Sequence, residues 1–307
     1  MTNKKKKSRA FDVIIAILFF IAACILVYPT FTDSICDIGQ TMVIGGYAGT
    51  VEELSSEEIS RIRKEAEEYN EKIYEKQVNR IFEFGDDYYT DEYDAILKTD
   101  DTNTMAYVEI PKINVYLPIV HGTNMTDLKT KIGHLVNTSV PVGGANTHAV
   151  ITGHTGLVSA ELFTNVEYLE EGDEVYIHVL DETLRYRVET KTVVTPGKEM
   201  PQLLIEEGRD LITLYTCTPY GINDCRLLVK CVRDGNVENT GADGTENQIN
   251  TQEKLAILHT IFWGIIPFIV LAIGLYFALR KKKKKSKRKI STIADDERKV
   301  QKAKMKT

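Results

Sequence analysis

Cysteine is scarce in this chain, with 5 among 307 residues. This excludes a small scaffold held together by many disulfides, because such folds are dense in cysteine. No Cys-x-x-Cys pair occurs, and Cys217, Cys225 and Cys231 have no histidine nearby at the spacing of a zinc site. The sequence therefore predicts no metal centre. An odd number of cysteines leaves at least one thiol without a partner in the same chain.

Long apolar runs are also few, and they occur only near the two ends of the chain. Residues 13–28 are uninterrupted apolar sequence, and residues 255–279 form a longer run whose polar interruptions are His259 and Thr260. A bilayer core takes about 20 residues to cross. The second run is long enough to cross a bilayer. The first run is short, and the core of a signal peptide is an alternative interpretation of it. Because no small-residue cleavage site follows it, we interpret the first run as an uncleaved anchor.

The net charge of -6 hides two basic ends and an acidic middle. Residues 1–10 and 280–307 together carry a net charge of about +16, so the middle carries about -22. Positive charge beside a membrane span marks the cytoplasmic side. We therefore predict that both termini are cytoplasmic and that the middle lies outside. The basic ends are interpreted as topology signals that contact the lipid bilayer, and not as a nucleic-acid site.

The sequence pattern of the middle changes twice. Residues 37–50 predict a short glycine-bearing connection, and residues 51–84 have the periodicity of an amphipathic helix. From residue 105 to 233, short runs rich in Val, Ile, Tyr and Thr alternate with turn residues. About seven or eight such strands predict a closed barrel or a sandwich. The predicted segments are a basic tail (1–10), a span (11–29), a helical and loop segment (30–104), a β-rich domain (105–233), a polar linker (234–254), a second span (255–279) and a basic tail (280–307).

Cys217 ends one of these apolar strands, and the chain then reverses through Pro219 and Gly221. Arg226 begins the returning strand, so an antiparallel hairpin would place it beside Cys217. A thiol nucleophile needs a basic or positive neighbour and partial exposure. A guanidinium is always charged and offers forked donors to a carbonyl or an oxyanion. The hairpin therefore predicts a nucleophilic Cys217 with Arg226 as its partner.

Such chemistry also needs a general acid and base, and the chain has 6 histidines that could supply it. His154 ends an apolar strand between Gly153 and Gly156, as expected of a residue at the rim of a barrel. His178 lies in the middle of a strand, where a packing or surface role is expected, and His259 lies in the second apolar run. The residues alone favour His154 and leave open the histidines at turns or before a strand, which are His121, His134 and His148.

Several stretches carry a resemblance to a known family. "TLYTCTPYGINDCRLLV", which begins at Thr213, resembles the cysteine and arginine signature of sortases, and "HAVITGHTGL", which begins at His148, resembles their histidine motif. "YVEIPKINVYLPIVHGT" and "FTNVEYLEEGD" are similar to class C, the pilin-polymerising branch of Gram-positive bacteria. The resemblance covers Met105 to Arg233. It implies a mainly β fold, an eight-stranded sortase-type β-barrel with short helices, preceded by an amphipathic helix and flanked by two transmembrane helices.

The resemblance implies a membrane-anchored cysteine transpeptidase of the bacterial plasma membrane, with no organic or metal cofactor. Its substrates would be pilin or surface proteins with an LPxTG-like sorting signal, cleaved between Thr and Gly. Cys217 would form the thioacyl intermediate, His154 would act as general acid and then as base, and Arg226 would stabilise the oxyanion. In class C the acceptor amine is typically a pilin lysine. Further signature positions would bind or support the substrate, namely Thr216, Pro219, Gly221 and Asn223.

One departure from the class C pattern concerns the lid. Class C enzymes commonly carry an Asp-Pro-aromatic motif that plugs the groove, and this sequence has no such motif. Asp86, Asp87 and Tyr88 form the candidate lid, since a carboxylate and an aromatic ring would suit the site of Arg226 and Cys217. An ordinary acidic surface loop is the alternative.

Alternatives also remain for the function and for the other cysteines. The chain could be a sortase that anchors surface proteins to peptidoglycan cross-bridges, or a non-catalytic, membrane-tethered binding module. Cys231 alternates with its strand neighbours and is expected in the core. A disulfide between Cys225 and either Cys231 or Cys36 is the alternative, and it would leave Cys217 free.

Overall fold

The computed structural model describes residues 3–81, 83–99 and 102–237, and from the rest of the chain 255, 259, 262–264 and 274. The chain divides into two compact units. One comprises Met1–Phe31 and His259–Thr307, and the other comprises Thr32–Leu258. The second unit holds the residues with predicted chemistry.

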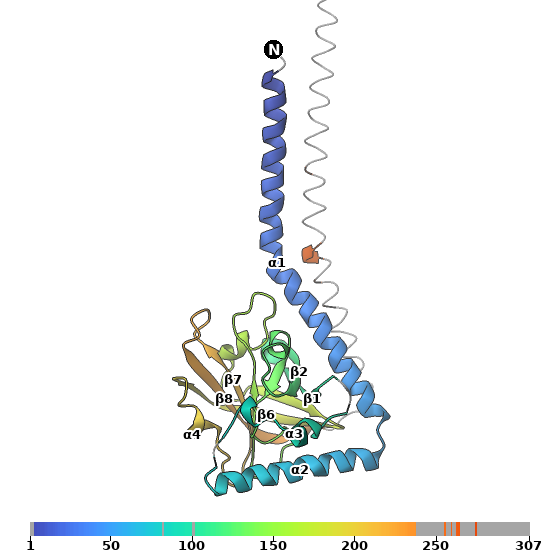
Figure 1. The fold of residues 1–307 in the computed structure, drawn as a ribbon, viewed down its shortest axis with the longest axis vertical. Coiled ribbons are helices and arrows are strands. Elements are labelled where there is room, and N and C mark those ends of the chain that lie inside the picture. The colour runs from blue at the N-terminus through green and yellow to red at the C-terminus, as the bar shows by residue number, and fades with distance from the viewer. Residues whose placement is uncertain are drawn as a thin grey trace, which may run out of the picture. The chain divides into compact units, whose positions relative to one another are not determined.

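The strands of the described residues close into a barrel (Figure 1). Their order around it is β1-β2-β3-β4-β7-β8-β6-β5. Parallel pairing joins β2 to β3 and β4 to β7, and the other neighbours are antiparallel. The eight-stranded barrel expected from the sequence is confirmed. The strands are β1 (Thr104–Ile110), β2 (Val115–His121), β3 (Ile132–His134), β4 (Thr147–Thr152), β5 (Glu174–Val179), β6 (Glu182–Val194), β7 (Asp210–Thr218) and β8 (Cys225–Val237).

Apolar side chains of the strands fill the barrel. On β5 buried and half-buried residues alternate strictly, which is the pattern of a strand with one face on the core and one toward solvent. Strand β4 is instead buried along almost its whole length. Ile151 faces the main core, and Val150 packs on the other side with Leu203 and the half-buried Phe84. The strand that leads to His154 is therefore held from both faces.

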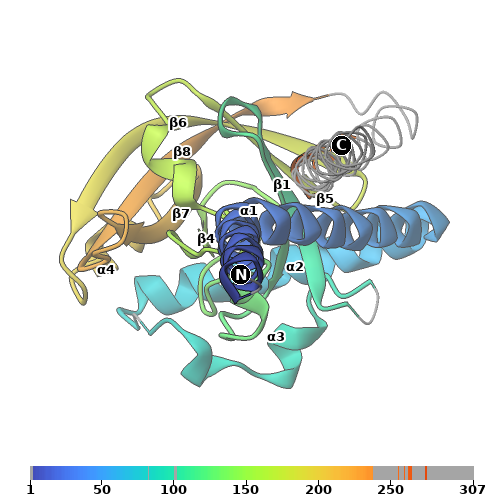
Figure 2. The ribbon, with the colours of Figure 1, turned by 90° about the horizontal axis from the view of Figure 1, so that it is seen from above.

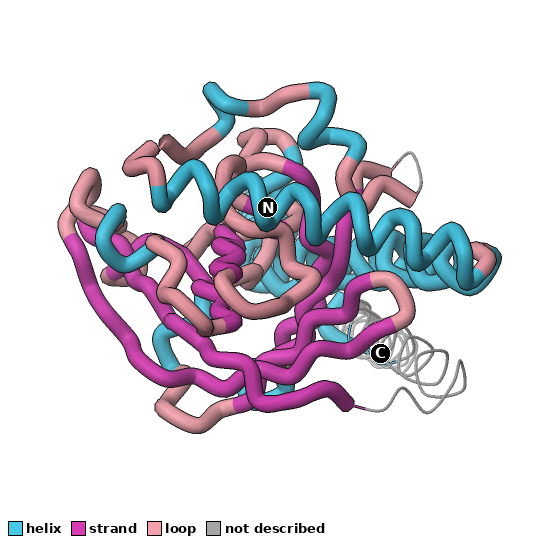
Figure 3. Tube along the Cα trace, turned by 90° about the horizontal axis from the view of Figure 1, so that it is seen from below, coloured by secondary structure: helices cyan, strands magenta, loops and turns pink. Residues whose placement is uncertain are grey.

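An amphipathic helix, α2 (Ser56–Val78), precedes the barrel as expected. A capping box sets its start, because Ser55 Oγ accepts from Glu58 N at 3.3 Å and Glu58 Oε2 accepts from Ser55 N at 2.9 Å. Its apolar face enters the core, and the Asn70 amide pairs with both backbone groups of Val140. Figure 3 shows α2 lying across the barrel, seen from below.

Helix α1 (Asn3–Glu53) extends further than the sequence predicts. Residues 37–50, expected to form a glycine-bearing connection, are helical. The Tyr47 hydroxyl donates to Met105 O at 3.1 Å and accepts from Leu180 N at 2.9 Å. Contacts with the barrel thus offset the low helix propensity of glycine, which costs about 1 kcal/mol per residue.

Strand β8 ends later than the predicted domain boundary at residue 233. It runs to Val237, and Arg185 on β6 donates through Nε and Nη2 to Asp234 O at 3.0 and 2.8 Å. The polar stretch that predicted a linker from residue 234 therefore begins as the end of a strand. Residues 238–254 lie outside the described residues.

Short helices connect the strands, in agreement with the sequence. The start of α3 is capped by Thr90 Oγ1, which accepts from Tyr93 N at 3.2 Å. Figure 2 shows α4 on the same side of the barrel as β7 and β8. The short elements are α3 (Asp91–Ala95), α4 (Met200–Leu203) and the 3-10 helices η1 (Asp86–Tyr88), η2 (Pro111–Ile113), η3 (Asp127–Lys129) and η4 (Thr164–Tyr168).

The predicted membrane spans are only partly within the described residues. Among those residues, no single helix has both the length and the apolar composition to cross a bilayer. The stretches Phe20–Leu26 and Tyr28–Glu53 meet that test together, with a bend of 44° at the break between them. Most of the second apolar run (255–279) and the tail (280–307) lie outside the described residues. Both spans therefore stay predictions.

Candidate active site

The predicted hairpin forms, and Cys217 lies directly opposite Arg226 in the antiparallel pair of β7 and β8. Pro219 shapes the turn, because its carbonyl accepts from Asn223 N at 2.9 Å. Gly221 and Asn223 have φ angles of 76° and 61°, in the left-handed region that glycine and asparagine enter most readily. These residues set the shape of the turn that joins Cys217 to Arg226.

Cys217 lies on a strand whose inner face is buried, whereas its own side chain is only half-buried. On the same strand Leu214 and Thr216 are 0% and 3% exposed, whereas Tyr215 and Cys217 are half-buried. Alternate residues of a strand point to opposite faces, and directly paired residues point to the same face. Tyr215, Cys217 and Arg226 therefore share the outer face of the hairpin, where the thiol can meet a peptide.

The parallel pairing of β4 with β7 brings His154 to the hairpin. The register pairs Thr152 with Tyr215. His154 and Cys217 each lie two positions further along their chains, so the register carries them side by side. Thr216 Oγ1 donates to the carbonyl of Gly153 at 2.7 Å, which ties the histidine segment to β7. His154 is half-buried, and its ring makes no hydrogen bond with a residue that the structure describes.

Two glycines allow the segment around His154 to approach its neighbours. A Cβ atom on Gly153 would lie 2.8 Å from Ile132 Cγ2, which is too close for any other residue. Gly156 has a φ angle of 75°, and a Cβ atom there would lie 3.5 Å from the ring of Tyr220. The histidine segment thus packs against both the core and the turn of the hairpin.

Backbone carbonyls anchor the guanidinium of Arg226. Its Nη1 donates to Cys225 O at 3.1 Å and to Asn223 O at 3.3 Å. Partial burial acts to lower the pKa of Arg226, but interactions with Cys217, Tyr215 and Glu199 outweigh it, and the pKa is raised. The guanidinium therefore lies within electrostatic reach of Cys217.

Two side chains that the sequence did not single out also lie at Arg226. The Tyr215 hydroxyl donates to Glu199 Oε1 at 3.3 Å, and both side chains interact electrostatically with Arg226. Burial, with help from Glu199, raises the pKa of Tyr215 to about 12. Strand alternation could have found Tyr215, two positions before Cys217. No local signal marks Glu199, which comes from the connection between β6 and β7.

The histidines that the sequence left open are structural. His121, His134 and His148 are buried, and both ring nitrogens of each lie within 3.1 Å of a polar partner. Burial lowers the pKa of all of them, to about 4 for His134 and His148. His178 stacks on Tyr107 with ring centroids 4.3 Å apart. Of the described histidines, His154 is the one placed beside Cys217.

The cysteines other than Cys217 have no comparable surroundings. All are free thiols, including Cys24, so the alternative disulfides do not form. Cys225 and Cys231 lie along one strand, about 20 Å apart, and cannot be bridged. Cys231 is fully buried in the core, as expected, and burial raises its pKa. The pKa of Cys36 on α1 is raised to about 12, mainly by burial.

The candidate lid is tied to the end of β2. The Asp86 carboxylate accepts from Thr123 N and from Thr123 Oγ1, both at 2.8 Å. Asp87 and Tyr88 are exposed. The contact expected of a lid, between Asp86 and Arg226, is not made by these described residues. The role of this segment as a lid or as an acidic surface loop therefore stays a prediction.

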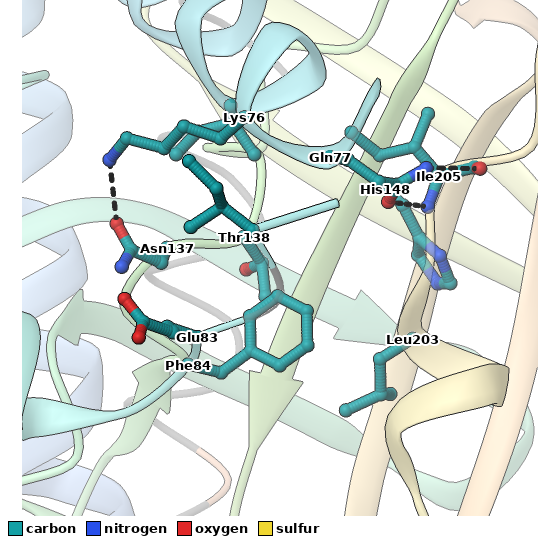
Figure 4. Close-up of a pocket in the computed structure, with 11 residues that line it drawn as sticks. Lys76, Gln77, Glu83, Phe84, Asn137, Thr138, His148, Leu203 and Ile205 are labelled. Atoms are coloured by element: carbon teal, nitrogen blue, oxygen red, sulfur yellow. Dashed lines mark hydrogen bonds between the residues drawn. The ribbon is translucent and has the colours of Figure 1, made fainter. Parts of the chain in front are cut away.

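A small hollow lies elsewhere, between the end of α2 and the barrel (Figure 4). Gln77 closes one side of it, because its amide donates to Ile205 O at 2.8 Å and accepts from Ile205 N at 2.7 Å. His148 lines it at the start of β4, which is the opposite end of that strand from His154. No group of three or more His, Cys, Asp or Glu side chains in the described part of the chain could hold a metal ion.

The barrel and its site match known proteins. Residues 108–234, which include His154, Cys217 and Arg226, match the family model of the sortase domain. Sortase C1 of Streptococcus agalactiae is 36% identical, with a TM-score of 0.58, and the match covers 64% of this chain and 100% of that one. The chain belongs to the sortase family. Sortases are cysteine transpeptidases, and this chain is therefore an enzyme of that type.

The structural likeness identifies the branch of the sortase family. Sortase C of Streptococcus pneumoniae is 36% identical, with a TM-score of 0.56, and the match covers 64% of this chain and 98% of that one. Sortase D of Bacillus subtilis (strain 168) is 29% identical over 126 residues, which are 41% of this chain and 60% of that enzyme. The structural matches, which cover almost the whole of the class C chains, make this chain a class C sortase.

Proposed function

We propose that this sortase joins proteins covalently through a thioacyl intermediate on Cys217, after cleaving an LPxTG-like sorting signal between Thr and Gly. One observation carries the proposal. Cys217 faces Arg226 across the hairpin, while the register of β4 and β7 brings His154 beside them. A nucleophile, a permanent cation and a proton carrier are the parts that acyl transfer needs.

In the first half-reaction, the Cys217 thiolate bonds to the carbonyl carbon of the signal threonine. Negative charge moves to the carbonyl oxygen, and the fork of Arg226 donates hydrogen bonds to it. The C–N bond then breaks, and protonated His154 gives its proton to the leaving glycine amine. The first substrate is left as a thioester on Cys217, with His154 neutral.

In the second half-reaction, the ε-amine of a pilin lysine attacks the thioester carbonyl. Neutral His154 takes a proton from this amine, the C–S bond breaks, and Cys217 leaves as a thiolate. The product is an isopeptide bond, and the enzyme returns to its starting charge state. Two observations support pilin as the acceptor: the class C likeness, and the pilin substrate specificity of the sortase C of Streptococcus pneumoniae.

The other signature residues support this chemistry by positioning. The Thr216 hydroxyl holds the segment of His154 against β7. The Asn223 carbonyl accepts from Arg226, and the bond from Asn223 N to the Pro219 carbonyl fixes that part of the turn. Gly221 permits the left-handed turn. Substitutions at these positions would act on Cys217, His154 or Arg226 through their placement.

The same proposal places the enzyme on the bacterial plasma membrane, with both termini in the cytoplasm and the barrel outside. The basic ends and the two apolar runs support this topology. Protease added to intact cells should then digest the barrel and leave both terminal segments protected. Digestion of either basic tail in intact cells would contradict the topology.

The acylation step is tested with the full chain in detergent, an LPxTG-type peptide and mass spectrometry of the intact protein. We expect an acyl adduct that survives Cys225→Ala and Cys231→Ala and disappears with Cys217→Ala. An adduct on another cysteine would contradict the role of Cys217. Absence of any adduct with sorting peptides would favour the non-catalytic binding module instead.

The acceptor is tested by competition on the preformed acyl-enzyme. A peptide with the lysine segment of a pilin and a peptidoglycan cross-bridge peptide are offered at equal concentration. The proposal predicts that the isopeptide product with the pilin lysine dominates. Dominance of the cross-bridge product would make the enzyme a cell-wall anchoring sortase.

A further inference from the structure

Arg226 has a contact that the proposed reaction does not use. Tyr215 lies two positions before Cys217 on β7, so the two side chains share a face with Arg226 across the pair. The Tyr215 hydroxyl donates to Glu199 Oε1 at 3.3 Å. Both side chains interact electrostatically with the guanidinium. Glu199 therefore holds the Tyr215 hydroxyl on the face that carries Arg226, and the hydroxyl oxygen keeps its lone pairs for a cation.

The fold brings Glu199 to Arg226 from the other side of β8. Strand β6 is the second neighbour of β8, and its last residue, Val194, pairs with Arg226. The chain continues from Val194 to Glu199, which is half-buried and precedes the first residue of α4. Arg226 therefore lies between two neighbouring strands, with Tyr215 supplied by β7 and Glu199 by the connection that follows β6.

The indirect contact has a physical advantage over a direct ion pair. A carboxylate bound directly to a guanidinium takes two of its donors in a bidentate pair. Glu199 is bound to Tyr215 instead, and it attracts the guanidinium without taking its donors. Nη1 is bound to the carbonyls of Asn223 and Cys225, so attraction toward Tyr215 and Glu199 restrains the orientation of the guanidinium. Donors of Arg226 remain for a substrate oxygen.

We propose that Tyr215 and Glu199 are positioning residues, which orient the guanidinium of Arg226 toward the carbonyl that Cys217 attacks. The inference rests on the proposed acylation of Cys217. Burial and the charge of Glu199 raise the pKa of Tyr215 to about 12. Its hydroxyl therefore keeps its proton and donates to Glu199 throughout the neutral pH range.

The test measures the rate of acyl-enzyme formation by the full chain in detergent, over a range of LPxTG-type peptide concentrations. Tyr215→Phe removes the hydroxyl and keeps the ring, and Glu199→Ala removes the acceptor. Each should lower the maximal acylation rate about tenfold, with the half-saturating peptide concentration changed by less than about twofold. Glu199→Gln, which retains an acceptor oxygen, should recover part of the rate. The double variant should be no slower than Tyr215→Phe alone, because both changes break the same hydrogen bond between Tyr215 and Glu199.

A matched control comes from the far strand β5, where the Tyr176 hydroxyl donates to Glu174. Tyr176→Phe removes the same type of bond and should leave the acylation rate unchanged. Wild-type rates in Tyr215→Phe and Glu199→Ala would overturn the inference, as would a change confined to the half-saturating concentration. An equal loss in the alkylation of Cys217 by iodoacetamide would indicate a disturbed hairpin and overturn it too. Failure of the wild-type chain to form any acyl-enzyme would contradict the proposed function itself.

Discussion

The barrel contains two kinds of histidine. His154 lies at the end of a strand, half-buried, and its ring has no hydrogen-bond partner among the described residues. His134 and His148 are buried, have partners for both ring nitrogens, and have a pKa lowered to about 4. A proton carrier must keep a nitrogen for the substrate, whereas a structural histidine has both satisfied. Residue type alone therefore does not distinguish the two roles.

The largest expected effect comes from removing His154. His154→Ala should lower transpeptidation by about 10²- to 10⁴-fold, since the leaving and attacking amines lose their proton carrier. Product formation is measured by chromatography with an LPxTG-type peptide and an amine acceptor. His178→Ala, which removes a half-buried histidine stacked on Tyr107, is the matched control and should stay near wild type. Equal losses of transpeptidation in both variants would contradict the distinction between the two kinds of histidine.

Arg226→Lys should have the next largest effect, about 10²-fold on the acylation rate. An ammonium keeps the positive charge but cannot reproduce the planar fork that reaches an oxyanion and the Asn223 carbonyl together. The rate is measured by rapid mixing and mass spectrometry. Lys112→Arg, at a surface lysine of η2 paired with Glu170, serves as a control for exchange of the two cations. Retention of the wild-type rate in Arg226→Lys would show that charge without geometry is sufficient.

The buried histidines should affect the free energy of unfolding and not the rate of turnover. Their folded pKa of about 4 lies below the unfolded value of about 6.5. Between those pH values the unfolded chain binds more protons, so the free energy of unfolding should fall by a few kcal/mol as pH falls from about 6.5 to about 4. Urea midpoints measured across this range would show it. His134→Gln should flatten the dependence on pH, and an unchanged slope would contradict a neutral, buried His134.

The smallest effect is expected at the candidate lid. Asp86 binds Thr123 and not Arg226, so Asp86→Ala should leave the acylation rate within about twofold of wild type. The measurement is the same acylation assay. A clear increase in rate would mean that Asp86 occupies the groove in solution, and the segment would then act as a lid.

Features set by neighbouring residues were predictable from the sequence. The capping box of Ser55 and Glu58, the alternating strands and the hairpin of Cys217 all depend on residues close in the chain. The helical course of residues 37–50 was not predictable, because Tyr47 is held by Met105 and Leu180 from distant strands. The contacts of the candidate lid were not predictable from the sequence either, since the Asp86 carboxylate binds Thr123.

By itself, the sequence determined a domain of about eight strands and the pairing of Cys217 with Arg226, because strand period and turn chemistry are local properties. The sequence favoured His154 among the histidines, but only the tertiary structure brings its segment to the hairpin. Gly153 and Thr216 are 63 positions apart and meet through the parallel pairing of β4 with β7, whose register depends on how the whole barrel packs. The approach of Glu199 to Arg226 was decided in the same way, by a connection that no period or motif in the sequence describes.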